Sequence, residues 1–278
     1  MVSSSGAGRG PCGEVRRVSD VLPSGRNGRP APETRSWAEP RRPRVTALRD
    51  GPELDDRVRS ALSCCPADLR SFGPILFHKG APLVSQGSSD PYVYLHLAGW
   101  ARVEAVTVRG HLVVVDFLLA GDMSGLAQEE EAAFSVIAMG DVLALRFLRD
   151  RLVDETDTNG ALRDICFDAL KGSLARMRDL RVALTGRSAA SKICCVLALL
   201  AERAAAASKG EPTIPISQLM LAHTVDLTPV AVNRTIQSLR RAGLLTWGPA
   251  GVRIFEPERL RTFASTVTPS ARRRLAGG

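Results

Sequence analysis

Apolar runs of strand length alternate with glycines from about residue 60 to residue 150. Glycine adopts positive φ at little steric cost, so these glycines suit tight turns. Several short strands at this spacing are typical of a β-sandwich or a small barrel. The pattern predicts turns at Gly80, Gly87, Gly99, Gly110 and Gly121, and strands over 75–78, 92–97, 101–108, 111–118, 134–138 and 142–147.

The next pattern, over residues 157–184, is helical. Apolar residues recur every three or four positions beside charged neighbours: Leu162, Cys166, Leu170, Leu174, Met177, Leu180 and Leu184. This stripe fits the seam of a two-stranded coiled coil, and it fits equally an amphipathic helix that packs on its own domain. The periodicity leaves both interpretations open.

Helix signals and a hairpin signal follow each other in the C-terminal part. A helix is expected from just after residue 186 to about 206, and the sequence Lys-Gly-Glu-Pro at 209–212 is typical of a helix stop. Ser217 can cap a short helix, a tight turn covers 225–227, and Thr228-Pro229 start a helix that ends at Gly243. Two apolar runs around the tip 248–251 then predict a β-hairpin. The unit reads as a winged helix-turn-helix.

The helix that starts at Thr228 has two chemically different faces. At about 100° per residue, one face carries Val232, Ile236 and Leu239. The opposite face is basic and rich in amides: Val230, Arg234, Gln237 and Arg241, with Asn233 at its edge. Such a face suits the major groove of DNA, where Arg binds guanine or phosphate, Asn and Gln bind adenine, and an apolar side chain meets a thymine methyl group. A solvated amphipathic helix is the alternative.

The net charge of +8 is concentrated at the two ends of the chain. Residues 1–50 carry ten Arg and five acidic residues, a net +5, and residues 211–278 carry nine Arg and four acidic residues, again +5. The intervening residues have a net charge of −2. A basic C-terminal module matches a polyanionic partner such as DNA.

Composition narrows the class of protein. The 278 residues are 45% hydrophobic and 24% charged, and no apolar run approaches the ~18 residues of a membrane helix, so no membrane partner is expected. The N-terminus has no leader-like apolar stretch, so we expect a cytoplasmic protein whose six cysteines stay reduced. Residues 1–57, rich in Arg, Pro, Gly and Ser, are expected to form a disordered basic arm. Two explanations of such an arm stay open, a mis-assigned start codon and a nonspecific tether to nucleic acid.

Two runs resemble the Crp-Fnr family of bacterial transcription regulators. The run LTPVAVNRTIQSLRRAGLL (227–245) is similar to the recognition helix and following turn of one branch of that family. The runs YLHLAGWARVEA and RGHLVVVDFLLAGDMSGL, within 94–126, resemble its cyclic-nucleotide-binding-like β-roll. The resemblance covers about residues 60–265 and implies an α+β protein. Its parts would be a jelly-roll-like β-roll sensor domain (58–156), a dimerisation helix (157–186), a winged helix-turn-helix domain (187–265) and a basic tail (266–278).

The resemblance also implies how such a protein works. It implies a homodimer joined along the central helix, bound to a palindromic site on double-stranded DNA, with RNA polymerase as a further partner. It favours the coiled-coil interpretation of 157–184, with the contacts made by Leu162, Cys166, Leu170, Leu174, Met177 and Leu180.

Single residues can be carried over from the family's recognition motif. Arg234 matches the arginine that contacts bases and phosphate, and Thr228 matches a helix-start hydroxyl that touches phosphate. Pro229 and Val230 stand where several relatives have Arg and Glu, so the operator cannot be copied from those relatives. Asp226 replaces the usual turn glycine, which Asp tolerates better than most residues. The expected DNA-contacting set is Ser217, Gln218, Thr228, Pro229, Val230, Asn233, Arg234, Gln237 and Arg241.

The sensor region departs from the relatives that bind cyclic AMP. Those relatives hold the phosphate with an Arg-Ser pair and the ribose with a Glu. The corresponding run GDMSGLAQEEEAAFSVIAM (121–139) contains no Arg, and Glu129, Glu130 and Glu131 would meet the phosphate without a counter-charge. We therefore expect no conventional cyclic-AMP binding, and the effector and any cofactor stay unassigned.

Cysteines and histidines offer no clear metal site. Cys64-Cys65 and Cys194-Cys195 are adjacent pairs that lack the spacing of iron–sulfur ligands, and we expect the second pair and Cys166 to be small buried hydrophobes. Redox sensing by the first pair is a minor hypothesis. The four histidines are scattered, and His96 alternates within an apolar strand, as a core residue does.

Two other function classes compete with the regulator. A small-barrel metalloenzyme would need a set of metal ligands that the histidine spacing does not supply, so we expect no catalytic and no metal-binding residues. A dimeric scaffold that binds proteins explains the helix over 157–184. It does not explain the Thr-Pro helix start, the basic face and the wing together.

Overall fold

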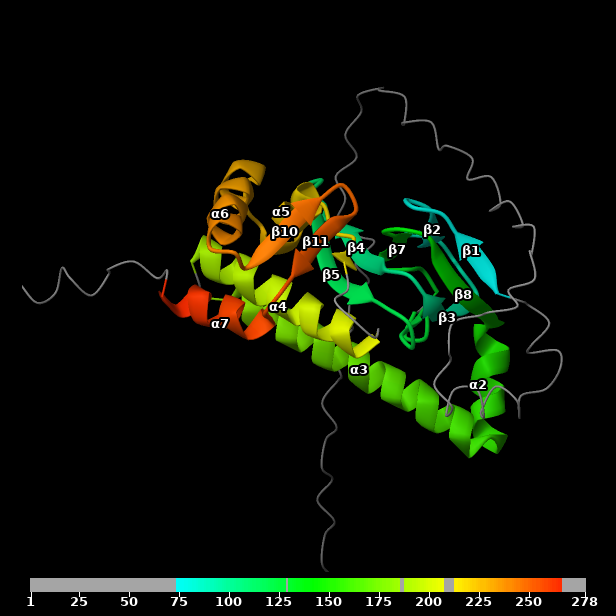
Figure 1. Cartoon of the computed structure of the whole chain (residues 1–278). Coiled ribbons are helices and arrows are strands. Elements are labelled where there is room, and N and C mark those ends of the chain that lie inside the picture. The colour runs from blue at the N-terminus through cyan, green and yellow to red at the C-terminus, as the bar shows by residue number, and fades with distance from the viewer. Residues whose placement is uncertain (1–73, 129, 186–187, 208–212, 267–278) are drawn as a thin grey trace, which may run out of the picture. The chain divides into compact units, whose positions relative to one another are not determined.

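The computed structural model describes residues 74–128, 130–185, 188–207 and 213–266 (Figure 1). Its N-terminal part is a β-roll of two four-stranded antiparallel sheets. One sheet has the order β1 (Ile75–Phe77), β8 (Val142–Leu148), β3 (Tyr92–Ala98), β6 (Met123–Ser124). The other has the order β2 (Pro82–Val84), β7 (Ser135–Ala138), β4 (Ala101–Val106), β5 (Leu112–Leu118).

The predicted β-sandwich is confirmed. Each expected strand is present, with ends that differ by at most two residues, and the five expected turn glycines all have positive φ. Gly99 shows why a side chain is excluded, because a Cβ there would lie 2.2 Å from the Asp141 carbonyl oxygen. The pattern missed β2 and β6, which have three and two residues and are too short to show an alternation.

Two cores hold the β-roll together, and the alternation of side chains along β3 serves both. One core lies between the sheets and includes Phe77, Leu83, Tyr94, Leu118, Val136 and Val142. The other joins Val93, Leu95 and Leu97 to two helices that follow the roll, α2 (Arg149–Thr158) and α3 (Gly160–Leu184). The sequence did not predict α2.

The expected long helix is α3. Asn159 caps it, because its side chain accepts a hydrogen bond from the Leu162 N–H at 3.1 Å. Leu162 and Cys166 share a core with Leu95 of the β-roll and Leu152 of α2, and Leu180 packs with α4 (Ala189–Ala207). The helix therefore contributes three of its six predicted dimer contacts, Leu162, Cys166 and Leu180, to the protomer's own core.

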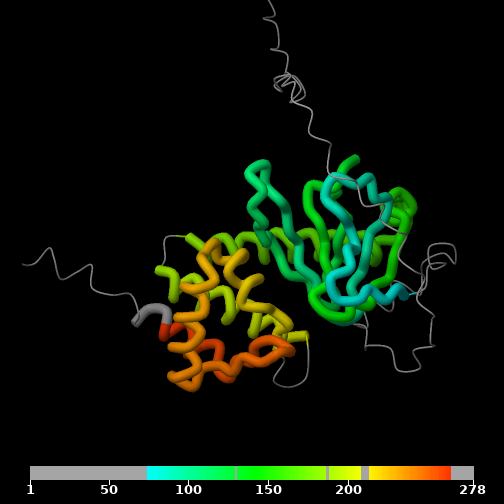
Figure 2. Tube along the Cα trace, turned by 90° about the horizontal axis from the view of Figure 1, so that it is seen from above, coloured from blue at the N-terminus to red at the C-terminus, as the bar shows by residue number. Residues whose placement is uncertain are grey.

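The C-terminal part contains the predicted winged helix-turn-helix. Its helices are α5 (Gln218–Val225), α6 (Pro229–Arg241) and α7 (Pro257–Thr266), and its sheet has the order β10 (Leu245–Gly248), β11 (Gly251–Ile254), β9 (Thr213–Ile214). Helix α4 packs against each of these helices, and Figure 2 shows them gathered in yellow to red. The sequence did not predict β9, which widens the hairpin to three strands.

Some predictions lie outside the described residues. They concern the arm over 1–57, the start of the sensor domain up to residue 73, Glu129, the helix stop at 209–212 and the tail from 267 onward.

Candidate nucleic-acid interface

Helix α6 starts as the sequence predicts. The Thr228 hydroxyl accepts a hydrogen bond from the Ala231 N–H at 3.3 Å, and Pro229 occupies the first helical position. The turn before it holds Asp226 at φ 51°, ψ 57°, the left-handed conformation that follows α5. Because Asp226 is the only non-glycine residue with positive φ in the described part of the chain, this turn is a specific backbone feature.

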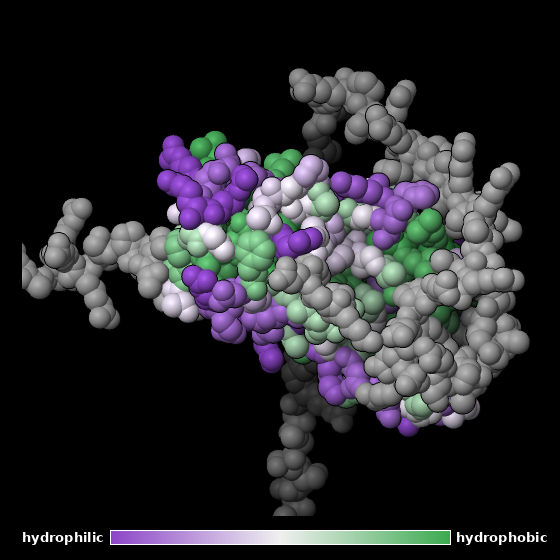
Figure 3. All heavy atoms as spheres, in the orientation of Figure 1, coloured by the Kyte–Doolittle hydropathy of each residue, from purple (hydrophilic) through white to green (hydrophobic). Residues whose placement is uncertain are grey.

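The two faces of α6 are also confirmed. Val232, Ile236 and Leu239 are fully buried against the core of the domain. The opposite side is exposed, including Val230, which is 62% exposed, and hydrophilic residues gather over α6 in Figure 3. The members of the predicted set that lie within α6 are all exposed: Pro229, Val230, Asn233, Arg234, Gln237 and Arg241. Thr228, directly before the helix, is exposed as well.

Polar groups on neighbouring turns of α6 are joined by hydrogen bonds. The Gln237 side-chain amide donates a hydrogen bond to the Asn233 side-chain oxygen at 3.3 Å, and Arg241 Nε donates to the Gln237 carbonyl oxygen at 3.3 Å. The partners in both pairs are four positions apart, where helical side chains meet. The face thus presents a guanidinium and amides in one row, the groups that read base edges in a major groove.

Two members of the predicted set stand on another element. Exposed Ser217 caps α5, since its hydroxyl accepts a hydrogen bond from the Met220 N–H at 3.0 Å, and half-buried Gln218 begins the helix. Two exposed arginines were missed by sequence reasoning: Arg240 on α6 and Arg253 on β11, which pairs with Thr246 of β10. Their positive charge in an already basic segment was the signal that could have found them.

A cluster of partly buried ion pairs joins the β-roll to the helices. Arg176 of α3 donates to Asp116 at 3.0 Å and to Asp122 at 2.8 Å, and Arg203 of α4 donates to Asp122 at 2.6 Å. Arg203 also donates to the Phe117 carbonyl oxygen. Burial raises the pKa of Asp116 and lowers the pKa of Arg203, and the opposite charges counteract both shifts. Sequence reasoning missed this cluster.

Two of the three cysteines within the described residues are buried, as expected: Cys166 and Cys194. Cys195 is only half-buried. Burial raises the pKa of Cys194 to about 12, so this thiol stays protonated at neutral pH. His96 is a core residue, as predicted, and its Nε2 lies 3.1 Å from the Ser124 hydroxyl oxygen. Cys64 and Cys65 lie outside the described residues.

Comparison with known proteins agrees with this architecture. The family model of the Crp-like helix-turn-helix domain matches residues 191–263. The nitrogen fixation regulation protein FixK of Bradyrhizobium diazoefficiens is 28% identical over 223 residues, 76% of this chain and 93% of FixK. The transcriptional activatory protein AadR of Rhodopseudomonas palustris is 27% identical over 206 residues, 72% of this chain and 86% of AadR.

Solved structures show the same fold. The structure of FixK2 from Bradyrhizobium japonicum has a TM-score of 0.61 at 20% identity and covers 69% of this chain and 96% of its own. No helix within the described residues is long and apolar enough to cross a membrane. These matches are to transcription regulators, so the metalloenzyme and scaffold alternatives are set aside. The chain thus contains a Crp-like helix-turn-helix domain after a β-roll and a long helix, and it resembles transcription regulators of the Crp-Fnr family along most of its length, which supports DNA-binding transcription regulation.

Proposed function

We propose that the protein binds a palindromic DNA operator as a homodimer, with α6 of each copy in the major groove. The observation that carries the proposal is the chemistry of α6: a fully buried apolar face and, opposite it, an exposed face of arginine and amides. Two such helices related by a two-fold axis would enter successive major grooves about one helical turn apart.

The dimer is supported by an apolar row left exposed on α3. Phe167, Leu170, Leu174 and Met177 are 61%, 41%, 62% and 39% exposed. Their spacing of three, four and three residues is that of a coiled-coil seam. This row revises the expected stripe, because Leu162, Cys166 and Leu180 pack inside their own protomer and Phe167 takes their place.

The roles proposed for single residues follow from their chemistry. Arg234, Asn233 and Gln237 would read base edges, since guanidinium and amide groups pair with guanine and adenine there. The hydroxyls of Thr228 and Ser217, together with Gln218 and Arg241, would contact phosphates and fix the register, and Pro229 and Val230 would meet thymine methyl groups. The +5 charge of residues 211–278 would supply much of the affinity in a salt-dependent manner.

The organisation of the chain follows from the same proposal. Residues 58–156 would form the sensor domain, 157–186 the dimerisation helix and 187–265 the DNA-binding domain, working in the cytoplasm where the chromosome lies. Because AadR is named a transcriptional activatory protein, we propose RNA polymerase as a further partner. We propose no cyclic-AMP dependence, since the run 121–139 holds no arginine.

Selection of bound genomic fragments by the purified protein tests this proposal. We expect the wild type to enrich a two-fold symmetric motif. Arg234→Ala should lose about 1–3 kcal/mol of specific binding and relax the base preference at one symmetric position, because it removes a base contact.

Arg240→Ala is the matched control. It removes the same charge from the same helix but lies about 120° around α6 from Arg234. Its binding should weaken equally on all sequences, and its motif should match that of the wild type. An unchanged motif and affinity in Arg234→Ala would rule out α6 as the reading helix.

A further inference from the structure

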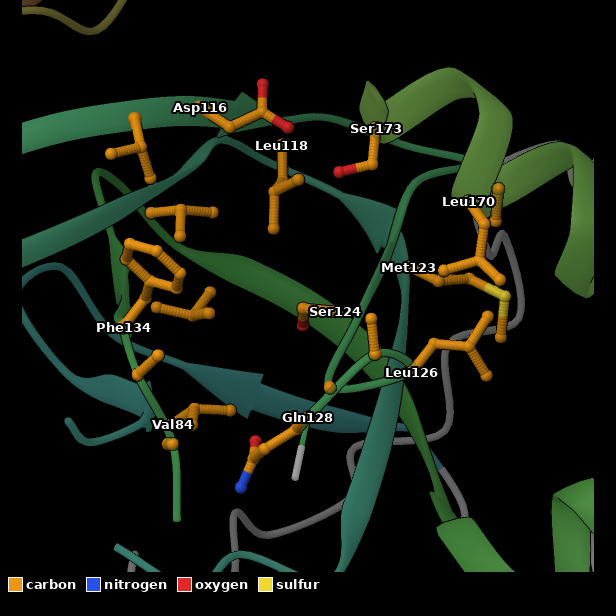
Figure 4. A pocket seen from close by; sticks show the side chains of 18 of the residues that line it. Val84, Asp116, Leu118, Met123, Ser124, Leu126, Gln128, Phe134, Leu170 and Ser173 are labelled. Carbon is orange, nitrogen blue, oxygen red and sulfur yellow. The ribbon is translucent and has the colours of Figure 1, made fainter. Parts of the chain in front are cut away.

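The β-roll contains a cavity of about 380 Å³ against α3, within the ~300–1,000 Å³ that small-molecule sites occupy. Most of its wall is apolar, including Leu118, Met123, Leu126 and Phe134. Figure 4 shows these side chains around a common space, with Ser124 at its centre and Ser173 of α3 at its upper edge. The cavity is therefore shaped for an apolar guest with few polar groups.

The charged groups at this cavity are acidic. None of its described lining residues is Lys, Arg or His, and the two charged ones are Asp116 and exposed Glu131. Asp116 is bound to Arg176, and in Figure 4 its carboxylate points away from the cavity. An anionic guest would thus lose its hydration and meet no counter-charge in the wall, which costs several kcal/mol for a buried charge.

A few uncharged polar groups can orient a guest. Figure 4 shows the Ser173 hydroxyl turned into the cavity and Gln128 at its lower edge. The Ser124 hydroxyl already contacts His96, and the Gln128 amide already donates to the Asp90 carbonyl oxygen at 3.2 Å. This leaves Ser173 as the main hydrogen-bonding group for a guest.

Part of the cavity wall is formed by α3, the helix that we propose as the dimer interface. Ala169, Leu170, Ser173 and Met177 of α3 line it, and Leu170 and Met177 are also in the exposed row. A guest that contacts these side chains changes the surface that a second copy meets.

We infer that this cavity takes an uncharged, largely apolar small molecule instead of an anionic nucleotide. The inference rests on the proposed function for its regulatory purpose. Binding of a guest in the cavity does not require DNA, so the inference about the cavity and the proposed function can be tested separately.

Two fluorescent probes that share one ring system and differ in charge test the inference on the full chain. N-phenyl-1-naphthylamine is neutral, and 8-anilino-1-naphthalenesulfonate carries a sulfonate. We expect the neutral probe to bind saturably, one per protomer, and the sulfonate to bind at least tenfold more weakly. Equal or tighter binding of the sulfonate would overturn the charge argument.

Filling variants locate the site. Ser173→Phe should weaken the neutral probe at least tenfold, because the ring occupies the cavity. Ala133→Phe fills it from an exposed lining position outside α3 and serves if the first variant does not fold. Ala161→Phe, exposed on α3 outside the lining, is the matched control and should bind as the wild type does. If folded lining variants keep wild-type affinity, the cavity is not the site.

Fragment selection on the same protein separates the two proposals. If the wild type selects a symmetric DNA motif but does not bind the neutral probe, only the inference about the cavity is wrong. If the wild type binds the neutral probe but selects no symmetric DNA motif, only the proposed function is wrong.

Discussion

His96 shows how strongly one side chain of the β-roll depends on its surroundings. It is fully buried, its Nε2 faces the Ser124 hydroxyl, and its backbone N–H donates to the Asp122 carbonyl oxygen at 2.9 Å. Burial is the largest cause that lowers the pKa of His96, Asp122 opposes it and Arg176 adds to it, and together they bring the pKa to about 4. The imidazole is therefore neutral in the folded protein near pH 7.

This shift predicts a pH-dependent stability. In the unfolded chain His96 has a pKa of about 6.5, so between pH 6.5 and 4 the unfolded state binds more protons and stability falls as the pH falls. The wild type should lose on the order of 2 kcal/mol more than His96→Gln between pH 7 and 5, measured by urea unfolding at each pH. His78→Gln, at an exposed histidine of the same β-roll, should follow the wild type. Parallel curves for the wild type and His96→Gln would contradict the prediction.

Helix caps and the conformation of single turn residues could be predicted from the sequence. The caps at Ser217 and Thr228 and the left-handed turn at Asp226 depend only on neighbours within four residues, and all three are present. The His96–Ser124 contact was not readable, because it joins residues 28 positions apart on two paired strands.

At the scale of elements, α3 serves two surfaces with one sequence. Its periodicity could not separate them, since apolar residues that face the protomer's own core and residues that face outward both recur every three or four positions. Only the packing on α2, α4 and β5 shows which residues remain outside. Of the six predicted contacts, Leu170, Leu174 and Met177 are exposed.

The exposed row predicts a substitution that breaks the dimer and spares the protomer. Leu174→Glu places a charge in the proposed seam, and at 62% exposure it should change protomer stability by no more than about 0.5 kcal/mol. The dimer dissociation constant, measured by sedimentation, should rise at least tenfold, as loss of a central apolar contact does. Leu219→Glu makes the same change at a 57% exposed leucine of α5 and should leave the dimer intact. A dimer unaffected by Leu174→Glu would exclude this face.

At the scale of the whole molecule, the sequence predicted which parts occur and in which order. It did not predict how the β-roll and α4 are joined, because the ion cluster unites residues 54 to 81 positions apart and charge patterning records only local neighbours. The cavity was unpredictable for the same reason, since β4, β6, β7 and α3 all contribute to its wall.

The ion cluster predicts that one carboxylate secures two elements at once. Asp122 is 16% exposed and binds Arg176 of α3 and Arg203 of α4, so Asp122→Asn leaves two partly buried guanidinium groups with an uncharged partner. Removing one member of a buried pair costs about 3–5 kcal/mol, and with the exposure here we expect about 2–4 kcal/mol in urea unfolding. Asp141→Asn removes a carboxylate from an exposed pair with His78 and should cost less than about 1 kcal/mol.

Hydrogen exchange should locate the loss of stability, because amides of α4 near Arg203 should exchange faster in Asp122→Asn while those between the two sheets stay protected. Equal stabilities of the two variants would mean that the apolar contacts of Val114 and Phe117 with the C-terminal core, and not the ion pairs, hold α4 on the β-roll.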